Sequence, residues 1–169
     1  AYEIAQLRAR VAELEAALLW RATPVEADLQ QPGLLLRQVM DVIPDSLYVK
    51  DRQLRKLLSN RTDRAYMGID DEADALGQTD EAVYSPEIAE SFRRQDEQVL
   101  RGERIINHEE RILVGSAEHW LLTTKVPLRD AAGNVVGLVG VGRDITELKH
   151  TREDLERLNR TLEERVLER

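Results

Sequence analysis

WLLTTKVPLRDAAGNVVGLVGVGRDIT (Trp120–Thr146) carries the strongest structural signal in this 169-residue chain. Two runs of β-forming residues, His119–Leu128 and Val135–Arg143, flank the pentapeptide Asp130–Asn134, whose composition is typical of a tight turn. Because side chains alternate between the two faces of a strand, each run predicts a half-buried strand. Together they predict an antiparallel hairpin.

The residues before this hairpin predict the rest of an α+β domain. Period-two patterns indicate strands at Ser46–Lys50, Arg55–Ser59 and Arg104–Leu113. Between them, PEIAESFRRQDEQVLRG predicts a helix that begins at Pro86 and ends before Gly102. The order of two strands, several helices and three strands favours an α+β fold with an antiparallel sheet.

Both ends of the chain carry a seven-residue apolar repeat. β-Branched residues at position a with leucine at position d favour a parallel two-stranded coiled coil, and a polar asparagine at a fixes its register. We therefore predict a homodimer through parallel coiled coils. The alternatives are an amphipathic helix packed on its own domain at the N-terminal end and a solvated helix of mixed charge at the C-terminal end. The predicted interface residues are Ile4, Leu7, Val11, Leu14, Leu18, Leu148, Leu155, Asn159 and Leu162.

These patterns divide the chain into four parts. Residues 1–20 are predicted to form the first coiled-coil helix, and residues 21–33, rich in Pro and Gly, a linker. The domain is expected at 34–146 and the second coiled-coil helix at 147–169.

Composition excludes several classes of function. The net charge of −8 disfavours nucleic-acid binding, which needs a basic face. The chain has no cysteine, so disulfides, thiolate metal sites and cysteine nucleophiles are excluded. We expect no metal site and no catalysis, since no catalytic motif is recognisable. No apolar run could span a bilayer, so we expect no membrane contact in this segment and a cytoplasmic location. Because the first residue is Ala and not Met, we expect a piece of a longer parent, for which a membrane anchor stays open.

Four stretches, taken in order, resemble a PAS domain. They are Ile43–Asp51 (IPDSLYVKD), Leu57–Asn60 (LLSN), Trp120–Asp130 (WLLTTKVPLRD) and Gly137–Thr146 (GLVGVGRDIT). The triplet Asp144, Ile145 and Thr146 is typical of the exit from a PAS core into a signalling helix, so we assign signal transmission to it. The tail LERLNRTLEERVLER resembles the linker that follows PAS domains in bacterial sensor histidine kinases and diguanylate cyclases.

The resemblance implies a five-stranded antiparallel sheet, strand order 2-1-5-4-3, with helices over one face. A cavity between sheet and helices holds a ligand or cofactor in many relatives. Without cysteine no cysteinyl-flavin adduct can form, and the segment 86–102 lacks the histidine of typical haem-binding relatives. The cofactor therefore stays unknown, with noncovalent flavin still open.

The resemblance also suggests which side chains line the cavity. The candidates are Asn107, Glu109, Leu121, Thr123, Lys125, Leu138, Gly140 and Gly142. Gly140 and Gly142 leave space for a ligand or for a neighbouring aromatic ring. Lys125 could bind a small polar or anionic ligand, pair with Glu109 or Glu110, or reach solvent. Trp120 is expected on the outer face, against a flanking helix or the partner subunit.

We therefore predict a non-catalytic sensory and dimerisation module of a bacterial signalling protein. A sensor histidine kinase is the first choice of parent and a diguanylate cyclase the second. In this interpretation a change at the cavity or interface reaches an output domain through the C-terminal helix. The rival interpretation is a ligand-free structural dimerisation module.

Overall fold

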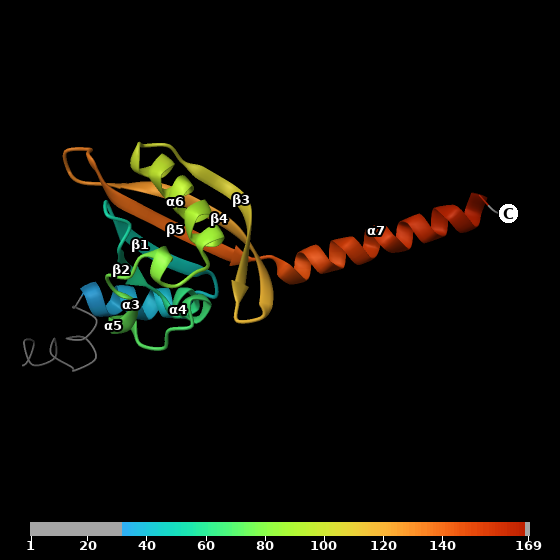
Figure 1. The fold of residues 1–169 in the computed structure, drawn as a ribbon, viewed down its shortest axis with the longest axis horizontal. Coiled ribbons are helices and arrows are strands. Elements are labelled where there is room, and N and C mark those ends of the chain that lie inside the picture. Colours follow the sequence, from blue (N-terminus) through green and yellow to red (C-terminus); the bar gives the residue numbers. More distant parts are fainter. Residues whose placement is uncertain (1–31, 168–169) are drawn as a thin grey trace, which may run out of the picture. The chain divides into compact units, whose positions relative to one another are not determined.

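The computed structural model describes residues 32–167 (Figure 1). Its elements are α3 (Pro32–Val42), β1 (Ser46–Asp51), β2 (Lys56–Ser59), α4 (Arg61–Met67), α5 (Glu72–Ala75), the 3-10 turn η1 (Asp80–Ala82), α6 (Pro86–Leu100), β3 (Ile105–Val114), β4 (Ala117–Arg129), β5 (Val135–Asp144) and α7 (Thr146–Leu167). All five predicted strands and the helix at Pro86 are present. Helix α3 begins at Pro32, inside the predicted linker, because proline is tolerated in the first turn of a helix.

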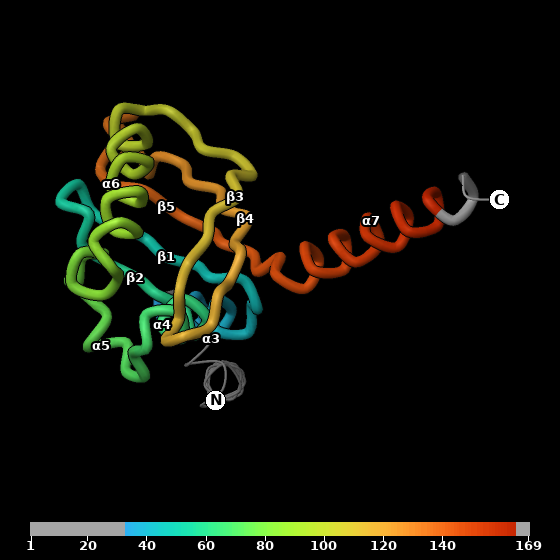
Figure 2. Tube along the Cα trace, turned by 45° about the vertical axis from the view of Figure 1, so that its right-hand side comes forward, coloured from blue at the N-terminus to red at the C-terminus, as the bar shows by residue number. Residues whose placement is uncertain are grey.

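The five strands form one antiparallel sheet in the order β2-β1-β5-β4-β3, as the resemblance implied. Helix α6 packs against β3, β4 and β5, and α4 packs against β1 (Figures 1 and 2). Helices α4 and α6 therefore cover one face of the sheet, and the site lies between this face and α6.

The side chains of β4 and β5 have the predicted orientation. Leu121, Thr123 and Lys125 are 6%, 1% and 1% exposed, whereas the alternating residues between them are partly exposed. On β5, Leu138, Gly140 and Gly142 are buried.

The predicted orientation of β3 was wrong. Asn107 and Glu109 are exposed, and Glu110 and Ile112 are buried instead. A bulge causes the difference: Ile105 pairs with Lys125 but His108 with Thr123, so three steps on β3 oppose two on β4. Asn107 takes the left-handed conformation at φ 52°, which asparagine tolerates better than most residues. The extra residue reverses the alternation of the side chains.

Only one of the two inward glycines leaves space. A Cβ atom on Gly140 would overlap the ring of Tyr48, so an aromatic ring fills this position. At Gly142 the nearest atom to such a Cβ would be Leu121 Cδ1, at 3.4 Å. The two alternatives for these glycines were space for a ligand or for a neighbouring aromatic ring. At Gly140 the space is filled by the aromatic ring.

Helix α7 follows β5 after a single residue. Leu148, Leu155 and Leu162 on α7 are 66%, 57% and 49% exposed, and Asn159 is also exposed. The N-terminal heptad from Ile4 to Leu18 lies outside the described residues. Within residues 32–167, no helix combines the length and the apolar character that crossing a bilayer requires.

Candidate functional site

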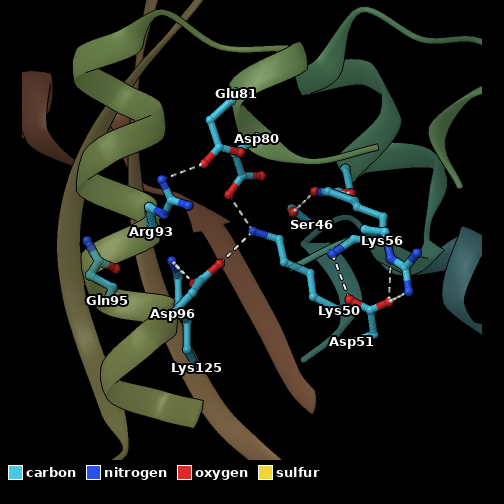
Figure 3. A network of polar contacts seen from close by, with 12 residues as sticks. Ser46, Lys50, Asp51, Lys56, Asp80, Glu81, Arg93, Gln95, Asp96 and Lys125 are labelled. Atoms are coloured by element: carbon cyan, nitrogen blue, oxygen red, sulfur yellow. Dashed lines mark hydrogen bonds and ion pairs between the residues drawn. The ribbon is translucent and has the colours of Figure 1, made fainter. Parts of the chain in front are cut away.

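Four charged side chains form a connected network between the sheet and the helices (Figure 3). Asp96 on α6 accepts hydrogen bonds from Lys50 on β1 at 2.7 Å and from Lys125 on β4 at 2.8 Å. Lys50 also donates to Asp80 on η1. All four side chains are at most 6% exposed. Three regions distant in sequence are therefore joined by ion pairs that water hardly screens.

A second buried pair lies next to this network. Lys56 on β2 donates to Asp63 on α4 at 2.5 Å, and both side chains are at most 4% exposed. Asp63 also accepts from the hydroxyls of Ser46, at 3.1 Å, and Ser59, at 2.5 Å. The side chain of Asn60 caps α4 by accepting from Asp63 N, which fixes the position of the carboxylate.

The pKa directions follow from burial and pairing. Burial by itself would lower the pKa of Lys50, but the carboxylates of Asp80 and Asp96 raise it above its ordinary value. Burial would raise the pKa of Asp96, but Lys50 and Lys125 hold it below its ordinary value. For Lys56, burial outweighs Asp63 and its pKa is lowered. Lys50 and Asp96 are thus both stabilised in their charged forms.

A cavity of about 20 Å³ adjoins these charges, which is the space of about one water molecule. Its lining residues include the charged side chains Lys50, Lys56, Asp63, Asp80 and Glu110 and the aromatic side chains Tyr48, Tyr66, Tyr84 and Phe92. Burial, followed by nearby carboxylates, raises the pKa of Tyr48 and of Tyr84. Both phenols therefore stay protonated and can donate hydrogen bonds into the cavity.

Glu110 differs from the other buried carboxylates. Its oxygens accept from the Thr123 hydroxyl at 2.5 Å and from the Gln95 amide at 3.0 Å, and the residue is 9% exposed. Among residues 32–167 no basic side chain forms an ion pair with it. It is a buried acid held by two neutral donors.

The predicted cavity residues are brought together only in part. Leu121, Thr123 and Gly142 line the cavity. Leu138 and Gly140 lie on the same sheet face outside that lining, and Asn107 and Glu109 point away. Lys125 pairs with neither Glu109 nor Glu110 and does not reach solvent. Its partner Asp96 on α6 was missing from the prediction.

Sequence patterns could have revealed several of the residues that the prediction missed. Asp96 follows Phe92 by four positions and precedes Val99 by three, so it occupies the buried stripe of its helix. Ser46, Tyr48 and Lys50 share one parity on β1. Each of these two elements carries a charged residue at a position that its pattern assigns to the core. This was the sequence signal that could have indicated a buried ion pair.

Asp144 connects the domain to α7. Its Oδ1 accepts from Thr146 N at 2.8 Å, while Oδ2 lies 2.8 Å from His119 Nδ1 and 3.2 Å from the Tyr66 hydroxyl. Burial would raise the pKa of Asp144, but these hydrogen bonds lower it. Ile145 is buried and donates its N–H to Trp120 O at 2.8 Å. All three residues predicted to transmit a signal therefore lie at this junction.

Trp120 and Glu109 contact α7 on the outer side of the sheet. Lys149 Nζ lies 4.0 Å from the centre of a Trp120 ring and 2.5 Å from Glu109 Oε2. The backbone N–H of Trp120 donates to Thr146 Oγ1 at 2.9 Å. Trp120 therefore packs against the flanking helix of its own chain. Within residues 32–167, no group of three or more His, Asp or Glu side chains is placed to hold a metal ion.

Known proteins with similar sequences and structures agree with this fold. The family model described as "PAS fold" matches residues 40–150. FilI, a methanogenesis regulatory histidine kinase of Methanothrix harundinacea, is 31% identical over 126 residues, which are 75% of this chain and 14% of FilI. ArcB, the aerobic respiration control sensor protein of Escherichia coli, is 30% identical over 132 residues, 78% of this chain and 17% of ArcB.

A solved complex of Vibrio cholerae VqmA with ligand and DNA superimposes with a TM-score of 0.60 at 25% identity, covering 67% of this chain and 51% of that chain. The chain spans less than a fifth of the two curated relatives, so the likeness concerns one domain of each. With the family match over most of its length and the strand order described above, the chain belongs to the PAS fold family.

Proposed function

We propose that this chain is the sensory and dimerisation module of a signal-transduction protein whose parent is a sensor histidine kinase. The junction at Asp144 carries this proposal, because one carboxylate bonds both the first turn of α7 and side chains of the domain. FilI and ArcB, named as a histidine kinase and a sensor protein, favour this parent over a diguanylate cyclase. We assign no catalytic step to the segment, and a cytoplasmic location is part of the same proposal.

Tyr66 supplies the route from the cavity to the helix. Its ring lines the cavity and makes an edge contact with His119, with ring centres 5.6 Å apart. Its hydroxyl donates to Asp144. A displacement of this ring therefore changes the hydrogen bonding of Asp144, the last residue of β5, which also accepts from the first residue of α7. Such a relay needs two states with different affinities for the signal.

The exposed leucines of α7 support a dimer. Leu148, Leu155 and Leu162 recur every seven residues and are about half exposed or more. A stripe of this kind is the usual contact of a two-stranded coiled coil. We propose that two chains pair in parallel along this stripe. A change in the rotational phase of the paired helices is then transmitted to the output domain.

A second candidate is a ligand-free structural dimerisation module. The size of the cavity and the Tyr48 ring beside Gly140 favour it. Native mass spectrometry of the purified chain separates the two. A dimer with a reproducible noncovalent excess of mass supports a sensor, and a dimer of bare mass supports the structural module.

Insertions in α7 of the full-length parent test the relay. One to three residues inserted after His150 shift the phase of the heptad, whereas seven residues preserve it. We expect the short insertions to abolish regulation of kinase activity and the seven-residue insertion to retain it, with the domain folded in both. Unchanged regulation in the short insertions would contradict the relay.

A further inference from the structure

We infer that the cavity selects a cationic ligand group, a protonated amine bound by Glu110, rather than an anion. This inference rests on the proposed sensory function, since it names the chemical class that the cavity would recognise. It replaces the expectation that Lys125 holds an anionic ligand. Lys125 is engaged by Asp96 and does not line the cavity.

When the charged groups around the cavity are matched in ion pairs, one carboxylate has no ammonium partner. The lining contributes two ammonium groups and three carboxylates. Lys50 is paired with Asp80, and Lys56 is paired with Asp63. Behind the lining, Asp96 and Lys125 add one charge of each sign. Glu110 is thus the buried acid that, within residues 32–167, forms no ion pair with a basic side chain.

An anionic ligand would have to break existing ion pairs. Lys50 donates to two carboxylates, and Lys56 donates to one that also accepts two serine hydroxyls. Removing one partner from a buried pair leaves an uncompensated charge, which is strongly unfavourable. A cationic group instead adds a partner to Glu110 and disturbs no ion pair.

The neighbouring tyrosines also favour a positively charged ligand group over an anion. The groups that raise the pKa of Tyr48 after burial are all carboxylates: Asp96, Glu110, Asp80 and Asp63. The same kind of contribution acts on Tyr84. Their phenol oxygens can also accept hydrogen bonds from an ammonium group. The ammonium groups of Lys50 and Lys56 lie 5.2 and 4.4 Å from the centre of the Tyr48 ring but are paired with carboxylates, so the lining offers Glu110 and the phenol oxygens as acceptors for a further cation.

The volume limits the size of the bound group. About 20 Å³ admits one group of the size of a water molecule, such as a primary ammonium. Binding of a ligand with a larger remaining part requires movement of lining rings, of which Tyr48, Tyr66 and Tyr84 are partly exposed. Because Tyr66 also bonds Asp144, entry of such a ligand would act on the start of α7.

NMR titration of the 169-residue chain with three small probes tests the inference. The probes are methylammonium chloride, sodium acetate and methanol at matched ionic strength. We expect methylammonium to produce saturable shifts of the Glu110 and Thr123 amides, and acetate and methanol to produce none. Glu110→Gln should weaken methylammonium binding at least tenfold, whereas Glu109→Gln, a change at the neighbouring exposed acid, should leave it unchanged.

The comparison of the three probes on the unaltered chain needs no variant, so it decides the question even if Glu110→Gln fails to fold. Saturable binding of acetate at these amides, or binding of methylammonium equal to that of methanol, overturns the cationic assignment. Absence of binding by all three probes overturns it as well. None of these results touches the relay, whose failure would appear in the insertion variants of α7.

Discussion

Replacing Asp96 with asparagine should destabilise the domain more than almost any other single polar substitution. Asp96 is 0% exposed and is the carboxylate shared by Lys50 and Lys125. In Asp96→Asn, Lys50 keeps Asp80, but Lys125 loses its ion-pair partner while remaining 1% exposed. The variant therefore contains a buried ammonium group without a counter-charge.

The expected loss is about 3–5 kcal/mol, the range for removing one partner of a buried pair. Lys125 Nζ also lies 5.0 Å from the centre of the Phe92 ring, but a cation–π contact of about 0.5–2 kcal/mol exists before and after the change and offsets nothing. Since whole domains are stable by about 5–15 kcal/mol, the loss is a large fraction of the total.

Urea denaturation followed by circular dichroism measures this loss. With an m-value of about 2 kcal/mol per molar urea, the midpoint should fall by about 1.5–2.5 M at unchanged m. Glu97→Gln is the matched control. Glu97 is the next residue of α6, about half exposed, and its ion pair within residues 32–167 is with Arg93, so its variant should lose about 0.5 kcal/mol or less.

A second substitution identifies the cause. Adding Lys125→Met to Asp96→Asn removes the uncompensated ammonium group and should recover part of the lost stability. A loss below about 1 kcal/mol in Asp96→Asn would refute the reasoning. So would a double variant no more stable than the single one, because the penalty would then not reside on Lys125.

Three further predictions concern the packing, the junction and the response to acid. Gly140→Ala should cost about 1–3 kcal/mol by overlap with a tyrosine ring on β1, whereas Gly142→Ala should be tolerated; equal midpoints in urea would contradict this. Tyr66→Phe should lower stability by about 0.5–1 kcal/mol and speed amide exchange in the first turn of α7 two- to fivefold, and unaltered exchange would remove Tyr66 from the relay. Because the folded pKa of Asp96 is depressed, its contribution should be full above the unfolded pKa of about 3.9 and should decline below it until pH has fallen through the folded value. Midpoints measured from about pH 7 to about pH 2 should show this decline begin near about pH 4, and Asp96→Asn should lack it.

The positions of the strands were predictable from local patterns, whereas the order of the strands and the inward face of β4 were predictable through the resemblance to PAS domains. Alternation places Leu121, Thr123 and Lys125 on one face of β4, and the resemblance identified that face as the buried one. On β3 the same rule gave the wrong face, because the bulge at Asn107 inserts one residue. A single slip of this kind reverses every side chain that follows it.

The candidate site was less predictable than the fold. Burial of Lys125 followed from its parity, but its partner Asp96 lies 29 residues away on another element. Pairing between distant charges depends on how α6 is placed on the sheet, which no local pattern encodes. Glu110 was considered only as a partner for Lys125, and its lack of a cation emerges only when every other buried charge has been paired.

The shared position of Asp96 has a consequence for how α6 can settle on the sheet. Apolar contacts alone would let a helix rotate or slide and find other acceptable packings. Turning α6 by one residue, about 100°, would bring Gln95 toward Lys50 and Lys125 and leave both ammonium groups facing an amide. We therefore expect the two lysines to specify a single rotational setting of this helix, and to contribute more to the uniqueness of the native packing than to its total stability.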